Sequence, residues 1–358
     1  MFLALRELLY AKTRYIMIGF IIVLIASLIF IISGLAKGLS ANNASALQDL
    51  PADYLLLEKS EETQLAKSLI PKADLEAVQA AAGVQDAAPL TIRMANTMVG
   101  DTDKSLDLAL FVTDGDMLLP KAIKGKQISA PDDLIVDQSV KKEGIKVGDQ
   151  LKSAGKTLTI AGFSEDERYS HTSVAYVSSK AFAGDPQLGG KVNAFAVKTD
   201  LSKEKLDSET GGVYKILTKD EALKGIPSYS EEQASLNMMI VFLLVIAAFV
   251  LAVFFYVMTL QKRSQFGVLK ALGTKTGYLI RSLLGQVTMI SVICIAIGAA
   301  LTYGIGLLLP EGMPFATSPA TMLQASVLIL AMALLGSLVS MFQVAKIDPL
   351  EAIEGGEK

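Results

Sequence analysis

Four apolar stretches constrain this chain more than any other feature of its sequence. They cover residues 15–36, 236–260, 283–309 and 321–344, and none of them contains a charged side chain. Each exceeds the roughly 20 apolar residues that an α-helix needs to cross a bilayer. Hydrophobic residues make up 51% of the chain and charged residues only 19%. These observations exclude a purely soluble enzyme and predict an integral membrane protein with four membrane-spanning helices.

The long segment between the first two apolar stretches, residues 37–233, has the composition of a soluble domain. Short apolar alternations predict strands in this segment, and the spacing of residues 72–82 predicts a helix. The predicted strands cover residues 108–113, 133–136, 150–152, 157–163, 172–177 and 192–197. We therefore expect an α-helical membrane protein with one large extracytoplasmic α+β domain, inserted between the first and second membrane helices.

The distribution of basic residues predicts the orientation in the membrane. Five Lys and Arg side chains crowd the connection 261–281, whereas the connection 310–320 has none. Because short cytoplasmic loops are enriched in Lys and Arg, we expect residues 261–281 and both termini in the cytoplasm. The domain 37–233 and the loop 310–320 are then outside.

Two terminal segments complete the predicted organisation. Residues 1–14 are apolar on most faces and predict a short interfacial helix on the cytoplasmic leaflet. A simple continuation of the first membrane helix is the alternative. Residues 345–358 form a cytoplasmic tail. The first apolar stretch is longer than the core of a signal peptide, so we expect it to be retained.

Composition also excludes several kinds of site. The formal net charge of −3 leaves no basic footprint for nucleic acid. A single cysteine, Cys294, and a single histidine, His171, rule out a disulfide framework and paired imidazole ligands within one chain. The nearest approach to a phosphate-binding loop is residues 267–276, whose glycines are one residue too far apart. We therefore expect no ATPase site, no catalytic residues and no intrinsic cofactor in this chain.

The order of these segments resembles the MacB/FtsX-type permeases of ABC transporters. Residues 261–280 are similar to the family's coupling segment, and the residues that match its pattern are Arg263, Gly267, Lys270 and Gly273. Gln265 stands where the family often has an acidic residue, and Phe266 replaces an aliphatic one. The resemblance implies a homodimer that works with two copies of a separate ATP-binding subunit, whose closure presses on the coupling segment.

A narrower resemblance is carried by residues 33–36, 51–53 and 229–239, which are similar to the permeases of haem-exporting pumps of Gram-positive bacteria. It implies that this chain lies in the cell membrane and exports haem to the outside, as a haem-detoxification device. Haem would be the transported substrate, and ATP would be bound by the partner subunit.

The chemistry of haem directs attention to Glu231 and Glu232, which lie at the outer boundary of the second membrane helix. Ionisable groups at this depth are costly unless they serve a purpose. Ferric iron accepts anionic oxygen ligands. In a C2 dimer, Glu232 from each protomer would supply one axial ligand to the haem iron. Glu232 is preferred because it shares a helical face with Tyr229 and Met239.

Each of these residues also has a structural interpretation. Ser230 and Gln233 match a capping box, in which case the two glutamates merely begin a helix. Tyr229 is a second ligand, a propionate partner or an interfacial anchor. Tyr169, in the extracytoplasmic domain, either caps the haem site or is an ordinary strand tyrosine. His171 suits haem iron chemically, but a solitary loop histidine is usually only exposed.

Other functions fit the same architecture. One alternative is a MacB-like exporter of peptides or an antibiotic, which needs neither glutamate. Another is an FtsX-like signalling protein that moves no substrate. Release of lipoproteins is a third. The paired acids at the membrane boundary argue against signalling, which has no use for them.

Overall fold

The computed structural model describes residues 12–61, 63–100, 102–153, 155–183, 190–310 and 313–346. The chain divides into two compact units. One unit, which we call the extracytoplasmic domain, comprises Leu39–Gln233, and the other, the membrane unit, comprises the chain before and after it. Two long helices, α2 and α6, cross the boundary between the units. Each unit is described by itself.

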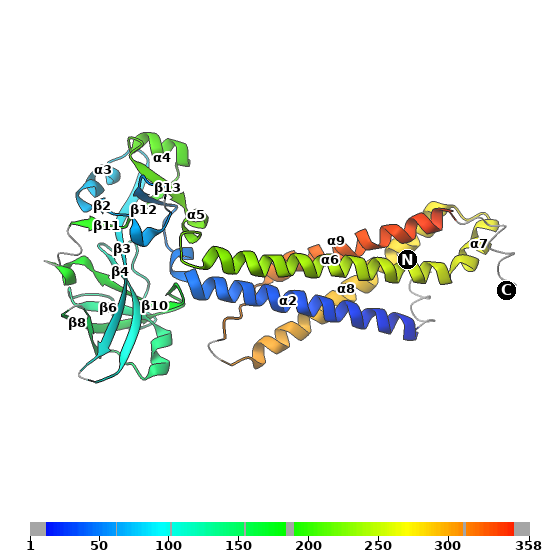
Figure 1. The fold of residues 1–358 in the computed structure, drawn as a ribbon, viewed down its shortest axis with the longest axis horizontal. Helices are drawn as coiled ribbons and strands as arrows, with labels where there is room; N and C mark the ends of the chain where they lie inside the picture. Colours follow the sequence, from blue (N-terminus) through cyan, green and yellow to red (C-terminus); the bar gives the residue numbers. More distant parts are fainter. Residues whose placement is uncertain are drawn as a thin grey trace. The chain divides into compact units, whose positions relative to one another are not determined.

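The membrane unit is built from long helices that lie lengthwise side by side (Figure 1). They are α2 (Lys12–Gln48), α6 (Tyr229–Gln261), α8 (Thr276–Leu308) and α9 (Pro319–Lys346), with the short α7 (Arg263–Ala271) between α6 and α8. All four long helices are apolar enough to cross a membrane. The expected set of four spans is therefore confirmed. Most of the segment 1–14 and of the tail 345–358 lies outside the described residues, although α2 already includes Lys12.

Small residues allow close packing of these helices. A Cβ atom at Gly298 of α8 would lie 3.0 Å from the Cβ of Ala26 of α2. A Cβ atom at Gly336 of α9 would lie 2.8 Å from the carbonyl oxygen of Ala248 of α6. Such close approach is typical of helix contacts in membranes. Gly304, in contrast, has open space where its side chain would be.

The extracytoplasmic domain is an α+β unit, as expected. Its strands are β1 (Tyr54–Glu58), β2 (Ile70–Pro71), β3 (Val84–Val99), β4 (Ser105–Thr113), β5 (Lys124–Gly125), β6 (Asp133–Asp137), β7 (Gln150–Ser153), β8 (Lys156–Ser164), β9 (Arg168–Tyr169), β10 (Thr172–Ser178), β11 (Lys191–Val192), β12 (Ala194–Thr199) and β13 (Tyr214–Thr218). Its α-helices are α3 (Leu75–Gln79), α4 (Lys203–Glu209) and α5 (Lys219–Leu223). Four 3-10 turns join these elements: η1 (Leu65–Lys67), η2 (Lys72–Asp74), η3 (Gln138–Glu143) and η4 (Ser179–Phe182).

Most strands of the described chain belong to one sheet with the order β13-β1-β12-β3-β4-β10-β6-β8-β5. The long antiparallel pair β3–β4 runs through its middle (Figure 1). Two short strands attach beside this path, because β7 pairs with β3 and β8, and β9 pairs with β10. The strands β2 and β11 form a separate two-stranded sheet.

The six strands predicted from alternation are present, with boundaries shifted by a few residues. The helix predicted over residues 72–82 is shorter. It begins as the 3-10 turn η2 and ends with α3 at Gln79. Gly83 adopts a φ of +85°, so the backbone turns there and enters β3. Gly83 lies four residues after the end of α3, so it sets the turn into the strand and does not cap the helix.

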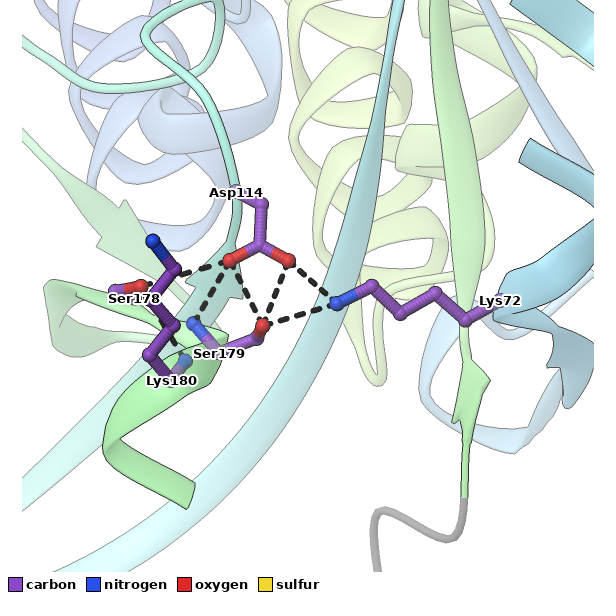
Figure 2. A network of polar contacts seen from close by, with 5 residues as sticks. All are labelled: Lys72, Asp114, Ser178, Ser179 and Lys180. Carbon is purple, nitrogen blue, oxygen red and sulfur yellow. Dashed lines mark hydrogen bonds and ion pairs between the residues drawn. The ribbon is translucent and has the colours of Figure 1, made fainter. Parts of the chain in front are cut away.

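The two ends of the large sheet, which we call its lobes, have separate apolar cores. One core lies around β1, β12 and β13, and the other around β4, β6, β8 and β10. Figure 2 shows a polar clamp between them, which we call the lobe clamp. In it, the Lys72 Nζ atom lies 2.5 Å from Oδ2 of Asp114 and 3.0 Å from Oγ of Ser179. The Ser179 hydroxyl also donates to Asp114.

A third apolar core contains the last turns of α2. Ala44 and Leu47 of this helix are buried with Phe111, Tyr169 and Tyr176 of the sheet. The predicted first span ended at residue 36, but the helix runs on to Gln48 because its final turns have an apolar face to bury. The end of α2 is thus an integral part of the domain, and it positions the site described next.

Candidate functional site

Three segments of the extracytoplasmic domain that are distant in the sequence meet at one place. They are the last turns of α2, the hairpin that connects β9 to β10, and the first turn of α6. The segments contribute Asn43, His171 and Glu232, respectively. Glu232, the residue preferred from the sequence, lies at the centre of this group, which we call the Glu232 cluster.

Both oxygens of the Glu232 carboxylate have a partner. Its Oε1 atom lies 2.9 Å from Nε2 of His171, and its Oε2 accepts a hydrogen bond of 3.2 Å from Nδ2 of Asn43. The His171 and Glu232 side chains are 40% and 30% exposed. The cluster is therefore open to solvent on one side, and a ligand can reach the carboxylate.

Asn43 is the buried member of the cluster. It is fully buried, and its Oδ1 atom has no hydrogen-bond partner among the described residues. Leaving a buried acceptor unsatisfied costs about 1–3 kcal/mol. The Asn43 amide therefore holds Glu232 at a net expense to the fold, which is a common property of residues that serve a site.

The hairpin that presents His171 has an unusual backbone. Thr172 pairs with Tyr169, so Ser170 and His171 form a two-residue connection. Their φ angles are +49° and +62°. This is the pattern of a type I′ turn, which normally carries Asn or Gly. Residues other than glycine in this region cost of order 1–3 kcal/mol each, and such strain is concentrated at functional sites.

Two hydrogen bonds attach this hairpin to α2. The Ser170 N–H donates to the carbonyl oxygen of Asn43 over 2.7 Å, and the Arg168 N–H donates to Oγ of Ser45 over 2.9 Å. Because these bonds use backbone groups of the hairpin, they fix its position independently of side chains at the turn. His171 is consequently held beside Glu232 by the fold itself.

A half-buried carboxylate, Glu167, directly precedes β9. It accepts a 2.8 Å hydrogen bond from the Tyr176 hydroxyl. Burial, together with the nearby Asp49, Asp137 and Asp166, raises the pKa of Glu167 to about 7, although the Tyr176 hydrogen bond opposes the shift. Glu167 therefore changes its charge near neutral pH. The Glu167 backbone N–H donates to Asp137. The group that titrates therefore lies at the base of the hairpin, directly before β9.

The helix start predicted for α6 differs from the observed one. The helix begins at Tyr229, directly after Ser228, whose φ is +63°. The Ser230 hydroxyl donates to the carbonyl oxygen of Lys224, so Ser230 is not the N-cap of a capping box with Gln233. A capping box does occur earlier, between Thr218 and Glu221 of α5. The capping-box part of the structural interpretation is therefore wrong, whereas both glutamates do lie in the first turn of α6, where the helix dipole favours them.

The other sequence-predicted site residues occupy different environments. Glu231 is exposed, on the same first turn as Glu232. Tyr229 is partly buried, and its hydroxyl lies 2.8 Å from Oγ of Ser40, which also accepts from Gln48. Tyr229 therefore belongs to a contact between α6 and α2 beside the Glu232 cluster.

Tyr169 lies in the interior of the domain. It is 3% exposed and packs edge-on against Phe111, with ring centroids 5.6 Å apart. Burial raises the pKa of Tyr169 to about 12. A phenol of this kind does not form a phenolate ligand readily. The structure therefore favours the strand interpretation of Tyr169 over its assignment as a cap of the haem site.

The segment that the family resemblance predicts to couple to an ATPase forms the helix α7. Its end has a Schellman arrangement, because the Thr274 N–H donates to Leu269 and the Gly273 N–H donates to Lys270. Gly273 has a φ of +87°, which only glycine adopts without strain. Gly267 is buried inside the helix, whereas Arg263 is exposed. Of the glycines in the predicted motif, Gly273 therefore ends α7 and Gly267 packs on its buried side.

A second polar cluster in the membrane unit lies next to α7. Lys262, which is 5% exposed, donates to the Tyr15 hydroxyl over 3.0 Å and to Oε1 of Gln286 over 3.5 Å. The Tyr15 hydroxyl donates to the same amide oxygen over 3.3 Å. We call this group the Lys262 cluster. It joins α2, the end of α6 and α8.

Sequence analysis missed Asn43, Ser170 and the contact of His171 with Glu232. Residues 40–45 lie just beyond the apolar stretch 15–36, so the sequence placed them in the domain and not in the first membrane helix. Ala44 and Leu47, at helical spacing, were the available signal that the helix continues. In the described part of the chain, no group of three or more His, Cys, Asp and Glu side chains is placed to hold a metal ion.

Comparison with known proteins adds relatives over the whole length. Residues 237–349 match the family model described as FtsX-like permease C-terminal. The chain is 30% identical, over 99% of both chains, to the "Putative hemin transport system permease protein HrtB" of Staphylococcus haemolyticus. The HrtB protein of Staphylococcus epidermidis has the same identity and coverage. An uncharacterised ABC transporter permease of Mycobacterium tuberculosis is 20% identical over 99% of both chains.

Solved structures resemble the extracytoplasmic domain more remotely. The periplasmic region of MacB from Actinobacillus actinomycetemcomitans has 15% identity and a TM-score of 0.39, covering 49% of this chain and 95% of that chain. The extracellular domain of the transporter YknZ from Gram-positive bacteria has 14% identity and a TM-score of 0.36, covering 47% and 100%. On the full-length similarity at 30% identity, this chain belongs to the FtsX-like ABC transporter permeases, in the group that includes the HrtB proteins.

Proposed function

We propose that this chain is the permease subunit of an ABC efflux pump that exports haem from the membrane to the outside. A separate ATPase subunit of the HrtA-like type, present in two copies, would drive the pump. The observation that carries the proposal is the half-exposed carboxylate of Glu232 on the first turn of a membrane helix, in a chain similar over its full length to proteins named for hemin transport.

The chemistry of the site supports this substrate. A carboxylate is a hard anionic oxygen ligand that suits ferric iron, whereas the apolar porphyrin suits the lipid-facing part of α6. Met238 and Met239, about two turns further along α6, are 56% and 43% exposed and offer an apolar surface. In a homodimer with C2 symmetry, two copies of Glu232 would face one iron from opposite sides. Glu231 and Tyr229 are the neighbouring candidates for contact with iron or propionates.

The proposed cycle begins in the cytoplasm. Both termini and the α7 segment would lie on the cytoplasmic side, as the distribution of basic residues indicates. ATP-driven closure of the ATPase subunits would act on Arg263, Gly267, Lys270 and Gly273. Two packings of the long helices, biased by nucleotide, would then alternately accept haem and release it outward.

A titration of ferric haem into the protein in nanodiscs tests the proposal. We expect a saturable Soret change with one haem per dimer. Glu232→Gln should weaken binding at least about tenfold, because an amide cannot replace an anionic ligand, and Glu231→Gln tests the neighbouring candidate on the same turn, with a smaller expected effect. Binding that survives both substitutions would move the ligand to Tyr229 or His171.

Absence of saturable haem binding to the native protein would overturn the proposal. A MacB-like exporter of peptides or an antibiotic would then be the remaining transport function. An FtsX-like signalling role would instead show itself as a protein partner for the extracytoplasmic domain, with an ATPase activity that no substrate stimulates.

A further inference from the structure

Each oxygen of the Glu232 carboxylate has one partner inside the extracytoplasmic domain. One oxygen contacts the His171 imidazole at 2.9 Å, and the other accepts from Asn43 at 3.2 Å. Each carboxylate oxygen has a second lone pair, so a ligand displaces a partner only where it approaches the oxygen from that partner's side. The two partners differ in how readily they release it. Asn43 is fully buried, whereas the His171 side chain is 40% exposed at the end of a strained turn.

We propose that His171 is a positioning residue that acts as a latch on Glu232. In the substrate-free protein it holds the carboxylate against the domain, and a substrate with a positive centre competes with it for the same oxygen. The inference rests on the proposed function only in the identity of that substrate. Asn43 keeps the second oxygen and so retains the direction of the carboxylate while the first oxygen is exchanged.

The backbone of the hairpin supports a latch rather than a chance contact. Ser170 and His171 both have positive φ angles, and the hairpin is attached to α2 by backbone hydrogen bonds from Ser170 and Arg168. Histidine tolerates this conformation better than most residues, but glycine tolerates it best. The turn therefore holds an imidazole where the backbone alone would favour glycine. The strain is stored where the exchange takes place.

The latch has a second consequence, because in the described part of the chain the hairpin meets the first turn of α6 through the side chains of His171 and Glu232. When the substrate takes Glu232, the link between His171 and α6 opens, while the hairpin stays attached to α2. Substrate binding would thus release α6 from the hairpin, while its contacts with α2 through Asn43 and Tyr229 remain.

The single histidine of the chain permits a direct experiment. Protein with ¹³C,¹⁵N-labelled histidine in nanodiscs gives one imidazole signal, from His171. We expect Glu232→Gln to move this signal, and the matched control Glu231→Gln to leave it in place. Saturation with gallium(III) protoporphyrin IX, a diamagnetic analogue of ferric haem, should move the native signal toward its position in Glu232→Gln.

Affinity provides a second measurement. His171→Gly removes the imidazole and relieves the turn, so it should fold as well as the native protein. Removing a competing, partly exposed hydrogen bond should tighten ferric haem binding by about three- to tenfold. Ser170→Gly is the matched control, because it relieves the same turn and leaves the latch intact. Its affinity should equal that of the native protein.

The outcomes separate this inference from the proposed function. If Glu232→Gln leaves the imidazole signal unmoved, or if His171→Gly weakens haem binding, there is no latch, and in the second case His171 is itself a ligand. If porphyrin binds but the signal stays in place, the proposed function stands and the exchange is refuted. If no porphyrin binds while Glu232→Gln still moves the signal, the internal contact stands and haem is the wrong substrate.

Discussion

The two polar clusters of this protein join α2 to α6 in different ways. In the membrane unit, Lys262 is 5% exposed and Gln286 is 2% exposed. In the extracytoplasmic domain, the side chains of His171 and Glu232 are 40% and 30% exposed. A buried charge must keep its acceptors at all times, because desolvation is costly when a partner is lost. A half-exposed pair can exchange a partner for water or for a ligand at small cost.

This difference in access implies a difference in role. The Lys262 cluster is suited to hold three helices in a fixed packing next to the coupling helix α7. The Glu232 cluster is suited to open and close. The same two helices would therefore be permanently joined at the end near Tyr15 and Lys262, and conditionally joined at the end near Asn43 and Glu232. Four predictions test or sharpen this contrast.

The largest effect is expected at Gln286. The substitution Gln286→Leu removes an acceptor from a buried ammonium group and should lower the free energy of unfolding by about 2–4 kcal/mol. Lys262→Met should cost less, because the charge leaves together with its need for acceptors. Unfolding in detergent measures both. An equal loss in the two variants would show that packing, and not the buried charge, stabilises this cluster.

The corresponding change in the Glu232 cluster sharpens the comparison. His171→Gly removes one member of a half-exposed pair and should change the free energy of unfolding by no more than about 1 kcal/mol. The same unfolding assay therefore ranks the two clusters on one scale. If His171→Gly were as destabilising as Gln286→Leu, the Glu232 cluster would be a structural centre and the contrast would be lost.

An intermediate effect is expected from Glu167, at the base of the hairpin. Its pKa is raised from 4.5 to about 7 in the folded protein. Between these values the folded state binds more protons than the unfolded state, so the contribution of Glu167 to stability falls as pH rises. Glu167→Gln removes this loss. It should be more stable than the native protein by about 1–3 kcal/mol at pH 8, with the gain disappearing near pH 4.5.

Unfolding measurements across this pH range test the sign as well as the size. Tyr176→Phe provides a matched variant, because it removes the hydrogen bond that opposes the pKa shift of Glu167. In that variant the loss of stability should extend to higher pH. A difference between Glu167→Gln and the native protein that does not vary with pH would contradict the prediction, and would remove neutral-pH titration from the base of the hairpin.

Much of the membrane unit could be predicted because one physical rule dominates it. Uncharged apolar runs of sufficient length have few alternatives to membrane helices. The end of α7 could also be anticipated from Gly273, since a glycine after a helix commonly adopts the left-handed conformation seen there. In the domain, strands such as β8 could be predicted because apolar and polar residues alternate within the strand itself.

The remaining elements depend on contacts that no local pattern specifies. The strand β3 contains Pro89 and the charged residues Asp86 and Arg93. It pairs with β4 and β12, and the residues in its middle, 87–92, are buried whichever face they point to. The alternation of apolar and polar residues therefore does not predict a strand whose two faces are both buried. Its existence is determined by partners that lie far away in the sequence.

The Glu232 cluster shows the same limit at the level of a site. Glu232 could be singled out because an acid at a membrane boundary requires an explanation. Its partners could not. Asn43 is 189 residues away and His171 is 61 residues away, and only the topology brings them together. The end of α2 was cut short in the prediction because the apolar run ends at residue 36, whereas its last turns are buried by the domain.

The smallest effect is expected at the lobe clamp, which tests whether half-exposed polar links in the domain are weak in general. Burial by itself raises the pKa of Asp114, but hydrogen bonds from Lys72 and Ser179 outweigh it and hold the pKa below its usual value. Its contribution to stability is thus present at neutral pH and is lost as pH falls below about 3.8.

Lys72→Met should cost about 0.5–1 kcal/mol at pH 7, since Ser179 still donates to Asp114. A double-mutant cycle with Asp114→Asn measures the coupling. A coupling above about 2 kcal/mol would show that exposure does not decide the strength of polar links here, and the weak latch inferred at His171 would lose its physical basis.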